Sequence, residues 1–244
     1  MAWRNKVTGL IMAACLAALG PVMAQEQYPA NAVRANLPSV VLVDAARKAP
    51  APHGSSPTLV VGTGSGFVVD RNGHILTSYH VVEKAQKITV TFSNGSKMKA
   101  DVVKVDKGLD AALLKVKNPK ARQVSLGDSS TVRPGMDAAW IYWQTRKETP
   151  VLDGKVSILN VTVHPLRVGL LGLSGTLGVG GAGAPVLDSS GKVVAMITAM
   201  ISPEQLEKSK DAGRLTPAVA AGARVFAIPI NSLKPLIRAA GVAR

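Results

Sequence analysis

Three parts of the sequence carry groups suited to acyl-transfer chemistry. His80, in Thr-Ser-Tyr-His-Val-Val, could act as a general base, because an unperturbed imidazole titrates near neutral pH. Asp110, in Leu-Asp-Ala-Ala-Leu-Leu, could accept a hydrogen bond from the other ring nitrogen and fix the tautomer. Residues 180–187 read Gly-Gly-Ala-Gly-Ala-Pro-Val-Leu, a loop whose backbone N–H groups could stabilise an oxyanion. The chain therefore offers a base, an orienting acid and amide donors, in that order.

The motifs around these residues resemble the HtrA-type family of trypsin-like serine proteases. Four segments carry the resemblance: 64–82 is similar to the histidine region, 109–115 to the aspartate region, 180–187 to the serine loop and 225–229 to the closing strand. The order His, Asp, nucleophile is that of chymotrypsin, not of subtilisin or the α/β-hydrolases. The resemblance covers about residues 59–240, which is nearly all of the expected mature chain.

The resemblance implies that Ala182 occupies the position of the nucleophile. The family's Ser-Gly-Gly-Pro aligns with Ala-Gly-Ala-Pro at 182–185, and a methyl group cannot attack a carbonyl. Losing the serine of a comparable triad costs about a millionfold in rate. A rival nucleophile, Ser174 in Gly-Leu-Ser-Gly, has no proline at the matching place. The implied oxyanion hole consists of the N–H groups of Gly180 and Ala182, because it needs amides rather than a hydroxyl.

The resemblance also places a substrate cleft along the strand that contains Ile197, Thr198 and Ala199. No Asp or Glu occurs between Gly154 and Asp188, where a trypsin-like pocket would hold its acid, so we expect specificity for small or apolar side chains. Two features depart from the family pattern. Tyr-Trp-Gln-Thr at 142–145 replaces the usual Gly-Asn-Pro turn, and we expect no PDZ-like domain, because the sequence ends at residue 244.

Short apolar segments separated by tight turns predict an all-β fold. Together with the resemblance, they predict two six-stranded antiparallel β-barrels of the trypsin-like serine protease fold, with a C-terminal helix. We place the protease domain at 59–244, with the first barrel at about 59–130 and the second at about 131–244. In the first barrel we expect strands in 59–69 (two strands bent at glycines), 74–78, 87–92, 97–103 and 111–116.

In the second barrel the expected strands are 137–143, 155–163, 184–187, 192–200 and 225–229. Residues 202–224 form a charged insertion that we expect to be partly helical, and 230–240 are expected to form the closing helix. The Gly-rich run from 169 to 183 is the only low-complexity tract.

The N-terminal residues 1–24 are typical of a secretory signal peptide. They combine a short positive segment, an apolar stretch and Val-Met-Ala before residue 25, so we expect a periplasmic or secreted protein. The alternatives are a membrane anchor, for which the apolar run is short, and lipidation at Cys15, which lacks a good lipoprotein signal. Cys15 is the only cysteine, so no disulfide is expected after cleavage. Residues 25–58 are a proline-rich N-terminal arm, in which 39–43 could form a strand or start a short helix.

The formal net charge is +14, and removing Arg4 and Lys6 with the leader lowers it by 2, to +12. A basic exported protein suits an anionic envelope surface. Nucleic acid is disfavoured as a partner, because the cations are dispersed and no nucleic-acid motif occurs. No Cys/His cluster has metal-ligand spacing, so we predict no metal and no cofactor. His53, His74 and His164 have no motif that suggests chemistry.

Three hypotheses follow. The first is an exported HtrA-like pseudoprotease that retains His80 and Asp110 and binds peptides or unfolded proteins. The second is an active serine endopeptidase of apolar-preferring specificity whose catalytic serine has been substituted by Ala182. The third is a basic envelope-binding protein that uses the scaffold only for its shape. The oligomeric state and the role of the 202–224 insertion stay open.

Overall fold

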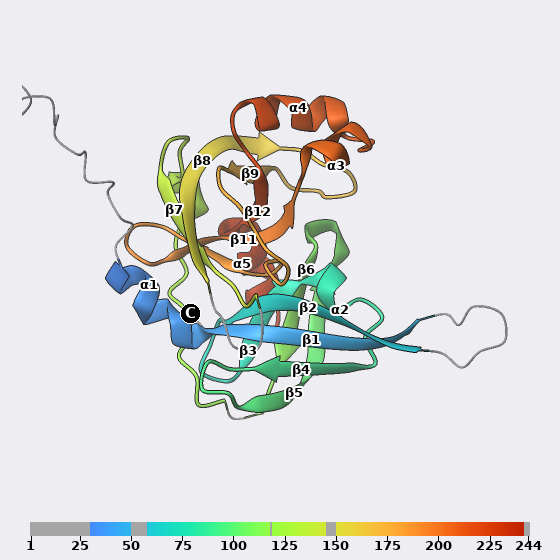
Figure 1. Cartoon of the computed structure of the whole chain (residues 1–244). Helices are drawn as coiled ribbons and strands as arrows, with labels where there is room; N and C mark the ends of the chain where they lie inside the picture. The colour runs from blue at the N-terminus through green and yellow to red at the C-terminus, as the bar shows by residue number, and fades with distance from the viewer. Residues whose placement is uncertain (1–29, 50–57, 118, 145–149, 242–244) are drawn as a thin grey trace, which may run out of the picture.

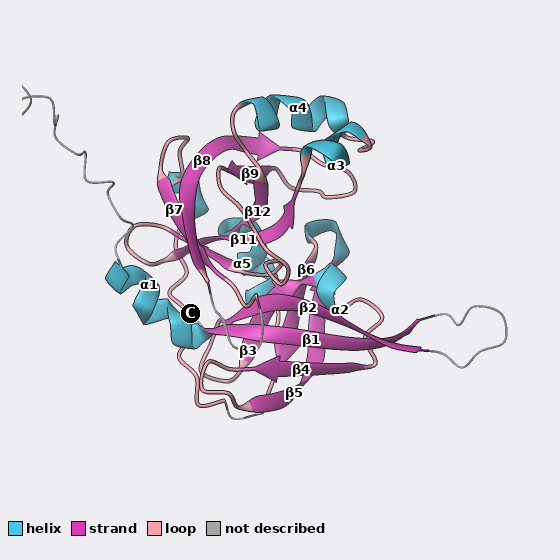
Figure 2. Cartoon of the chain, viewed as in Figure 1, coloured by secondary structure: helices cyan, strands magenta, loops and turns pink. Residues whose placement is uncertain are grey.

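The computed structural model describes residues 30–49, 58–117, 119–144 and 150–241. In this part of the chain, strands β1 to β12 close into two antiparallel barrels of six strands each, one above the other in the view of Figure 1. Figure 2 shows that helices lie mainly at the ends of the barrels and in connections. The predicted all-β, two-barrel fold is confirmed. The expected signal peptide, 1–24, lies outside the described residues.

The first barrel has the strand order β1-β2-β3-β6-β5-β4. Its strands are β1 (Val40–Ala49), β2 (Thr58–Val68), β3 (His74–Ser78), β4 (Lys87–Thr91), β5 (Lys97–Asp106) and β6 (Ala111–Lys115). Helix α1 (Ala30–Asn36) and the short η1 (Leu37–Ser39) precede them, while α2 (Tyr79–Val82), η2 (Lys107–Leu109) and η3 (Ser129–Thr131) lie in connections or beyond the barrel.

Strand β1 falls within the segment that we expected to be an arm. It pairs with both β2 and β4, so the first barrel begins at Val40 and the expected boundary near residue 59 is too late. The sequence pattern left 39–43 open between strand and helix, because Val40 to Val43 are all buried, on both faces, and therefore do not alternate with polar residues.

Strand β2 is a single long strand, not the two strands that we expected to bend at glycines. The glycines instead allow neighbouring segments to pack closely against β2. A Cβ on Gly64 would lie 2.6 Å from the side chain of Val81, and a Cβ on Gly66 would lie 2.9 Å from the carbonyl oxygen of Leu76. The turn after β2 is as predicted, with Gly73 at φ +92°.

The second barrel has the strand order β10-β11-β12-β9-β8-β7. Its strands are β7 (Asp137–Ile141), β8 (Val151–Val161), β9 (Leu170–Leu173), β10 (Pro185–Leu187), β11 (Val193–Met200) and β12 (Val225–Pro229). Strand β9 was not predicted, because it lies in the Gly-rich tract and is buried throughout. The predicted helical insertion is confirmed as α3 (Pro203–Glu207) and α4 (Ala212–Ala220), and the closing helix is α5 (Ile230–Arg238).

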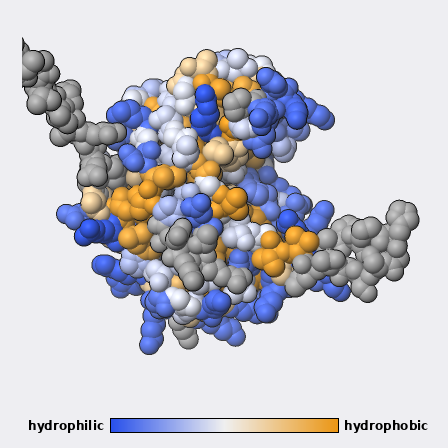
Figure 3. Space-filling view, viewed as in Figure 1, coloured by the Kyte–Doolittle hydropathy of each residue, from blue (hydrophilic) through white to orange (hydrophobic). Residues whose placement is uncertain are grey.

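Apolar side chains fill both barrels and the space between them. The largest fully buried side chains include Trp140, Phe67 and Phe226, and α5 turns Leu233 and Ile237 into the cluster that contains the two phenylalanines. Figure 3 shows apolar residues gathered near the junction of the barrels and along the outer part of the β1–β2 hairpin. Among the described residues, no helix has the length and apolar character needed to span a membrane.

Candidate active site

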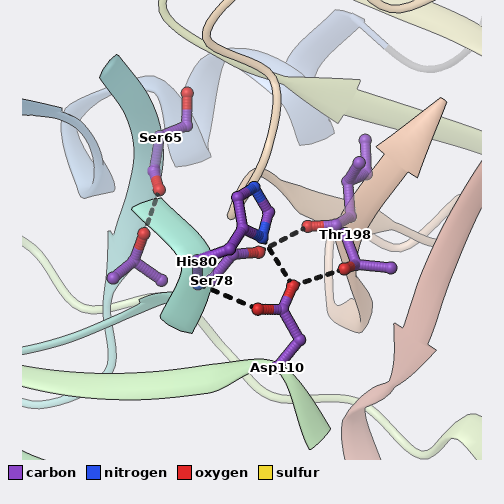
Figure 4. A network of polar contacts seen from close by, with 7 residues as sticks. Ser65, Ser78, His80, Asp110 and Thr198 are labelled. Atoms are coloured by element: carbon purple, nitrogen blue, oxygen red, sulfur yellow. Dashed lines mark hydrogen bonds and ion pairs between the residues drawn. The ribbon is translucent and has the colours of Figure 1, made fainter. Parts of the chain in front are cut away.

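His80 and Asp110 meet at the end of the first barrel that faces the second barrel. His80 lies in α2, directly after β3, and its Nδ1 is 2.8 Å from Oδ2 of Asp110. The backbone N–H of His80 donates to Oδ1 of the same carboxylate at 2.9 Å. The two bonds hold the ring and its helix turn on one carboxylate, as Figure 4 shows. The structure therefore brings together the two predicted residues, which are 30 positions apart in the sequence.

The backbone around Asp110 is set by a tight turn. Asp110 follows η2 and has φ +46°, a left-handed conformation that Asp tolerates better than most residues. Its carbonyl oxygen accepts the N–H of Tyr79 at 3.0 Å, which joins the turn to the start of α2. The loop after β8 supports the turn from the second barrel. The N–H of Arg167 donates to the carbonyl of Gly108 at 2.8 Å, and its guanidinium donates to Asp106 at 2.7 Å.

Thr198 of β11 supplies a third contact to the Asp110 carboxylate. Its hydroxyl donates to Oδ2 at 2.5 Å, and the residue is buried. The Asp110 side chain is 12% exposed, whereas the His80 side chain is 50% exposed. Because Nδ1 is held by the carboxylate, Nε2 is the ring nitrogen that remains for a bound molecule. Sequence reasoning placed Thr198 along the cleft but missed this bond, which comes from the other barrel.

Ala182 lies in the loop between β9 and β10, close to both barrels. Its carbonyl oxygen accepts the N–H of Ser65 in β2 at 2.8 Å, and its methyl group packs with the cluster that contains Val81, next to His80. The following N–H, of Gly183, donates to the carbonyl of Ile197 at 2.8 Å. The hydroxyl of Ser78 donates to the same carbonyl at 3.2 Å. The loop is thus attached to β2 through Ser65 and to β11, the strand that carries Thr198.

The backbone N–H groups of this loop alternate in their use. Those of Gly181, Gly183 and Ala184 donate to the carbonyls of Gly178, Ile197 and Gly181, respectively. Within the described residues, the N–H groups of Gly180 and Ala182 donate to no backbone or side-chain acceptor. These two are the groups that the sequence predicted as an oxyanion hole, and they remain available to an anion.

Glycine is required at position 180. The residue has φ +93°, and a Cβ would lie 2.1 Å from the carbonyl oxygen of Trp143. Tyr142 and Trp143, which depart from the family pattern, bond to two different segments. The indole N–H of Trp143 donates to the carbonyl of Val40 at 3.2 Å, and the Tyr142 hydroxyl accepts the N–H of Gly178 at 3.0 Å. The departure therefore adds one bond to the loop, through Tyr142, and one to the start of β1, through Trp143.

The other candidate residues lie as follows. Ile197 is fully buried, so only its backbone reaches the junction, while Ala199 is exposed on β11. The hydroxyl of Ser174 accepts the backbone N–H of Lys155 in β8 at 2.8 Å, apart from His80 and Asp110. In the described part of the chain, no group of three or more His, Cys, Asp or Glu side chains could hold a metal ion.

Comparison with known proteins agrees with the fold and with the contacts among His80, Asp110 and Thr198, which are those of a trypsin-like peptidase domain. The model of the trypsin-like peptidase domain family matches residues 64–196. The chain therefore belongs to the trypsin-like peptidases.

The relatives specify the branch of that family. The chain is 32% identical over 149 residues to the putative serine protease HhoB of Synechocystis sp., covering 59% of this chain and 36% of that protein. It is 31% identical over 134 residues to a probable periplasmic serine endoprotease DegP-like of Halomonas elongata, covering 54% of this chain and 28% of that one. The chain is of the HtrA type, and it spans well under half the length of these curated relatives.

Solved structures with a similar fold also include HtrA-type proteases. HtrA-type protease AlgW, in a serine-to-alanine form with a decapeptide, superposes with a TM-score of 0.74 at 21% identity, covering 88% of this chain and 68% of that one. The serine endoprotease from Yersinia pestis superposes with a TM-score of 0.65 at 22% identity, covering 88% and 66%. At this identity the likeness shows a shared fold.

Proposed function

We propose that this chain is an exported HtrA-type protease homologue that binds apolar peptide segments without cleaving them. The observation that carries the proposal is Ala182, in a loop fastened to β2 and to β11, the strand whose Thr198 donates to Asp110. The base and its orienting acid are in place beside amides suited to an oxyanion. What is missing is the oxygen nucleophile.

The hydroxyls around this junction are all engaged elsewhere. Ser65 donates to the carbonyl of Gly180 at 2.7 Å, Ser78 to that of Ile197 at 3.2 Å and Thr198 to Asp110 at 2.5 Å. A hydroxyl that already donates to a protein acceptor has no proton free for His80. The rival Ser174 bonds to β8. These contacts support a site that lacks a nucleophile.

Peptide binding is supported by the free edge of β11. Beyond Ile197 this strand pairs with β12 on one side only, among the described residues, so an extended peptide could add on the other side. Exposed apolar side chains occur on this strand and in the glycine-rich loop. Met200 is 39% exposed, and Val179, directly before Gly180, is 81% exposed. One fold relative is described with a decapeptide and another with a tripeptide, which supports peptide binding but not a particular mode of it.

A serine endopeptidase with a substituted nucleophile is the second candidate. It is favoured by the completeness of the rest of the site, because three hydrogen bonds hold the Asp110 carboxylate against His80 and Thr198. The same experiment tests the active site under both hypotheses. The hypotheses differ in whether Ala182 is the natural residue or a substitution for serine.

The test compares hydrolysis of an apolar peptide by this chain and by Ala182→Ser. We expect no detectable turnover in the first and a rise of at least about a thousandfold in the second. A Ser174→Ala change in the Ala182→Ser chain should leave the activity unchanged, and a fluorophosphonate should label only chains with Ser at 182. Turnover by the unaltered chain that disappears in Ser174→Ala would show that the nucleophile was assigned wrongly.

Binding is tested separately from cleavage. The affinity of fluorescent apolar peptides should fall about tenfold in Val179→Asp, because a charge would replace an apolar contact at the rim. Val103→Asp is the matched control, since Val103 is 46% exposed on β5 of the first barrel. Equal effects of the two changes, or no peptide binding at all, would contradict the proposal.

Export is proposed from the leader-like residues 1–24 and from relatives that are named periplasmic. Cell fractionation of the full chain and of a chain lacking 1–24 checks it: the first should be found outside the cytoplasm and the second within it. Binding to an anionic envelope surface stays a prediction from the net charge. Salt-insensitive sedimentation with liposomes would count against it.

A further inference from the structure

Ser65 connects the first barrel to the glycine-rich loop more closely than any residue that the sequence motifs suggested. It lies in β2 and is fully buried. Its hydroxyl donates to the carbonyl of Gly180 at 2.7 Å and accepts the backbone N–H of Trp143 at 2.9 Å. Its own N–H donates to the carbonyl of Ala182 at 2.8 Å. One residue therefore holds the loop at two carbonyls and the neighbouring Trp143 segment at an amide.

The two carbonyls held by Ser65 belong to the two residues whose N–H groups are unused, and each lies in the peptide plane that follows its residue. The Gly180 carbonyl follows the N–H of Gly180 along the chain, and the Ala182 carbonyl follows the N–H of Ala182. Fixing each carbonyl limits the rotation of the residue whose N–H must point at a ligand. Figure 4 shows Ser65 set apart from the His80, Asp110 and Thr198 contacts, so its effect on the loop is separate from its neighbours' effect on the ring.

The backbone of Ser65 is fixed in turn by the first barrel. Its carbonyl oxygen accepts the hydroxyl of Thr77 at 2.6 Å, and the loop approaches so closely that a Cβ on Gly183 would lie 2.1 Å from the same oxygen. A Cβ on Gly64 would lie 3.0 Å from the Ala182 carbonyl. A rigid strand thus presents the Ser65 hydroxyl to the loop, with no room for the loop to shift toward the strand.

We propose that Ser65 is a positioning residue that aims the N–H groups of Gly180 and Ala182 at an oxyanion or carboxylate bound beside His80. This role rests on the proposed function for its ligand, a peptide held along β11. Removing the hydroxyl leaves the Gly180 carbonyl and the Trp143 N–H without their buried partner. Buried polar groups rarely stay unpaired, so the loop is expected to turn its peptide planes in search of other partners.

The first experiment uses the chain as it stands and compares two peptides that differ at one end. An apolar peptide that ends in a free carboxylate can accept from both amides, whereas its C-terminal amide form cannot carry the charge. We expect the acid to bind about tenfold more tightly than the amide. In Ser65→Ala we expect this preference to disappear: the acid should bind about as weakly as the amide, and the affinity for the amide should be unchanged.

The matched control is Thr91→Val, which removes another buried hydroxyl of the first barrel. Thr91 is buried in β4, and its hydroxyl has no partner among the described residues. This variant should keep the preference for the acid. An equal loss of affinity for both peptides in Ser65→Ala would mean that Ser65 only supports the fold, and an unchanged preference would overturn the proposal. Should Ser65→Ala fail to fold, Ser65→Cys retains the volume with a weaker donor, and a smaller loss of the same kind is expected.

The second experiment separates this role from the proposed function. In the Ala182→Ser chain, Ser65→Ala should lower kcat about a hundredfold with little change in KM, because the amides act mainly on the oxyanion of the transition state. If Ala182→Ser is inactive and neither peptide binds, the proposed function fails. The positioning role is then decided by the backbone amide NMR shifts of Gly180 and Ala182, which should move in Ser65→Ala and stay in Thr91→Val. Unmoved shifts in Ser65→Ala would refute it.

Discussion

Two histidine–aspartate pairs in the first barrel have the same bonding pattern and different surroundings. In the turn between β2 and β3, Oδ1 of Asp70 accepts the backbone N–H of His74 at 2.9 Å, and Oδ2 lies 2.6 Å from its Nδ1. Asp110 holds His80 in the same way, at 2.9 Å and 2.8 Å. The geometry of the pair alone therefore does not distinguish a site from a structural contact.

Exposure and connection to the second barrel make the difference. The His74 side chain is 10% exposed and its partner is four residues away, so that pair closes a local turn. The His80 side chain is 50% exposed, and Thr198 of the second barrel donates to its aspartate. A histidine–aspartate pair becomes a candidate site when its second ring nitrogen is accessible and when a distant element orients the carboxylate.

The largest expected effect is a difference in kcat between variants of the two histidines. In the Ala182→Ser chain, His80→Ala should lower kcat by at least about ten-thousandfold, because the general base is lost, while the melting temperature stays nearly unchanged. His74→Ala should do the reverse, lowering stability by about 1–3 kcal/mol with the kcat of the folded fraction retained. Peptide hydrolysis and thermal unfolding of the same samples measure both. A large kcat loss in the His74 variant would erase the distinction.

The two aspartates should differ in the same direction. Asp110→Asn in the Ala182→Ser chain should lower kcat about ten-thousandfold, because the amide favours the wrong tautomer of His80. Asp70→Asn should cost about 1 kcal/mol of stability and leave kcat in place, since His74 has no part in the proposed reaction. Steady-state kinetics and denaturant unfolding check the pair. Similar kcat values for the two variants would count against assigning the site to Asp110.

Thr198 sharpens the comparison, because in the described part of the chain only the exposed pair has a hydroxyl partner from the second barrel. Thr198→Val keeps the shape of the side chain and removes the hydrogen bond to Asp110. In the Ala182→Ser chain we expect kcat to fall about tenfold, which is the effect of one such bond. The pH–rate profile is the second readout: a shift of its acid limb would show that Thr198 acts through the pair, whereas an unmoved profile would argue for packing alone.

The smallest effect concerns the pH dependence of stability at the buried pair. Burial alone would raise the pKa of Asp70, but hydrogen bonds from the ring and backbone N–H of His74, with the charges of His74 and Lys115, hold the pKa below its usual value. The ionised carboxylate therefore contributes stability above the unfolded pKa of about 3.9, and this is lost as pH falls through the lower folded pKa. Asp70→Asn should flatten the acid side of the stability curve.

Unfolding free energy measured between about pH 5 and pH 2 checks this sign. Asp101→Asn is the control, because Asp101 and Lys99 form a highly exposed ion pair at 3.6 Å, and such pairs contribute little to stability. A curve for Asp70→Asn that falls as steeply as that of the unaltered chain would show that the buried pair carries no pH-dependent stability.

Local patterns in the sequence predicted much of the fold. The hairpin turn before β3 was readable from Asn72-Gly73, and the closing helix from its apolar spacing. Strand β9 escaped because it is buried throughout and lacks alternation, while β1 was left open between strand and helix because its first four residues are all buried. In both cases the missing signal was periodicity, which a strand shows only when one face meets water.

The candidate site was predictable where one motif carries the chemistry and hidden where partners are distant. His80, Asp110 and the glycine-rich loop each had a recognisable local context. Ser65 lies in the histidine-region segment, but its role was hidden, because its partner Gly180 is 115 residues away. Asp70 and His74 were equally hidden. An aspartate in a turn and a histidine four residues later suggest no chemistry until burial and the short contact between them are known.

The bonds between the barrels also set when the site can exist during folding. Ser65 to Gly180 spans 115 residues, Ser78 to Ile197 spans 119 and Thr198 to Asp110 spans 88. Contacts of such long range form late, because the entropy of closing the intervening chain is lost before they stabilise anything. A half-folded chain with one closed barrel would therefore have the His80 ring and no oriented loop. Peptide-binding competence should appear in one late kinetic phase, after most of the β-sheet signal.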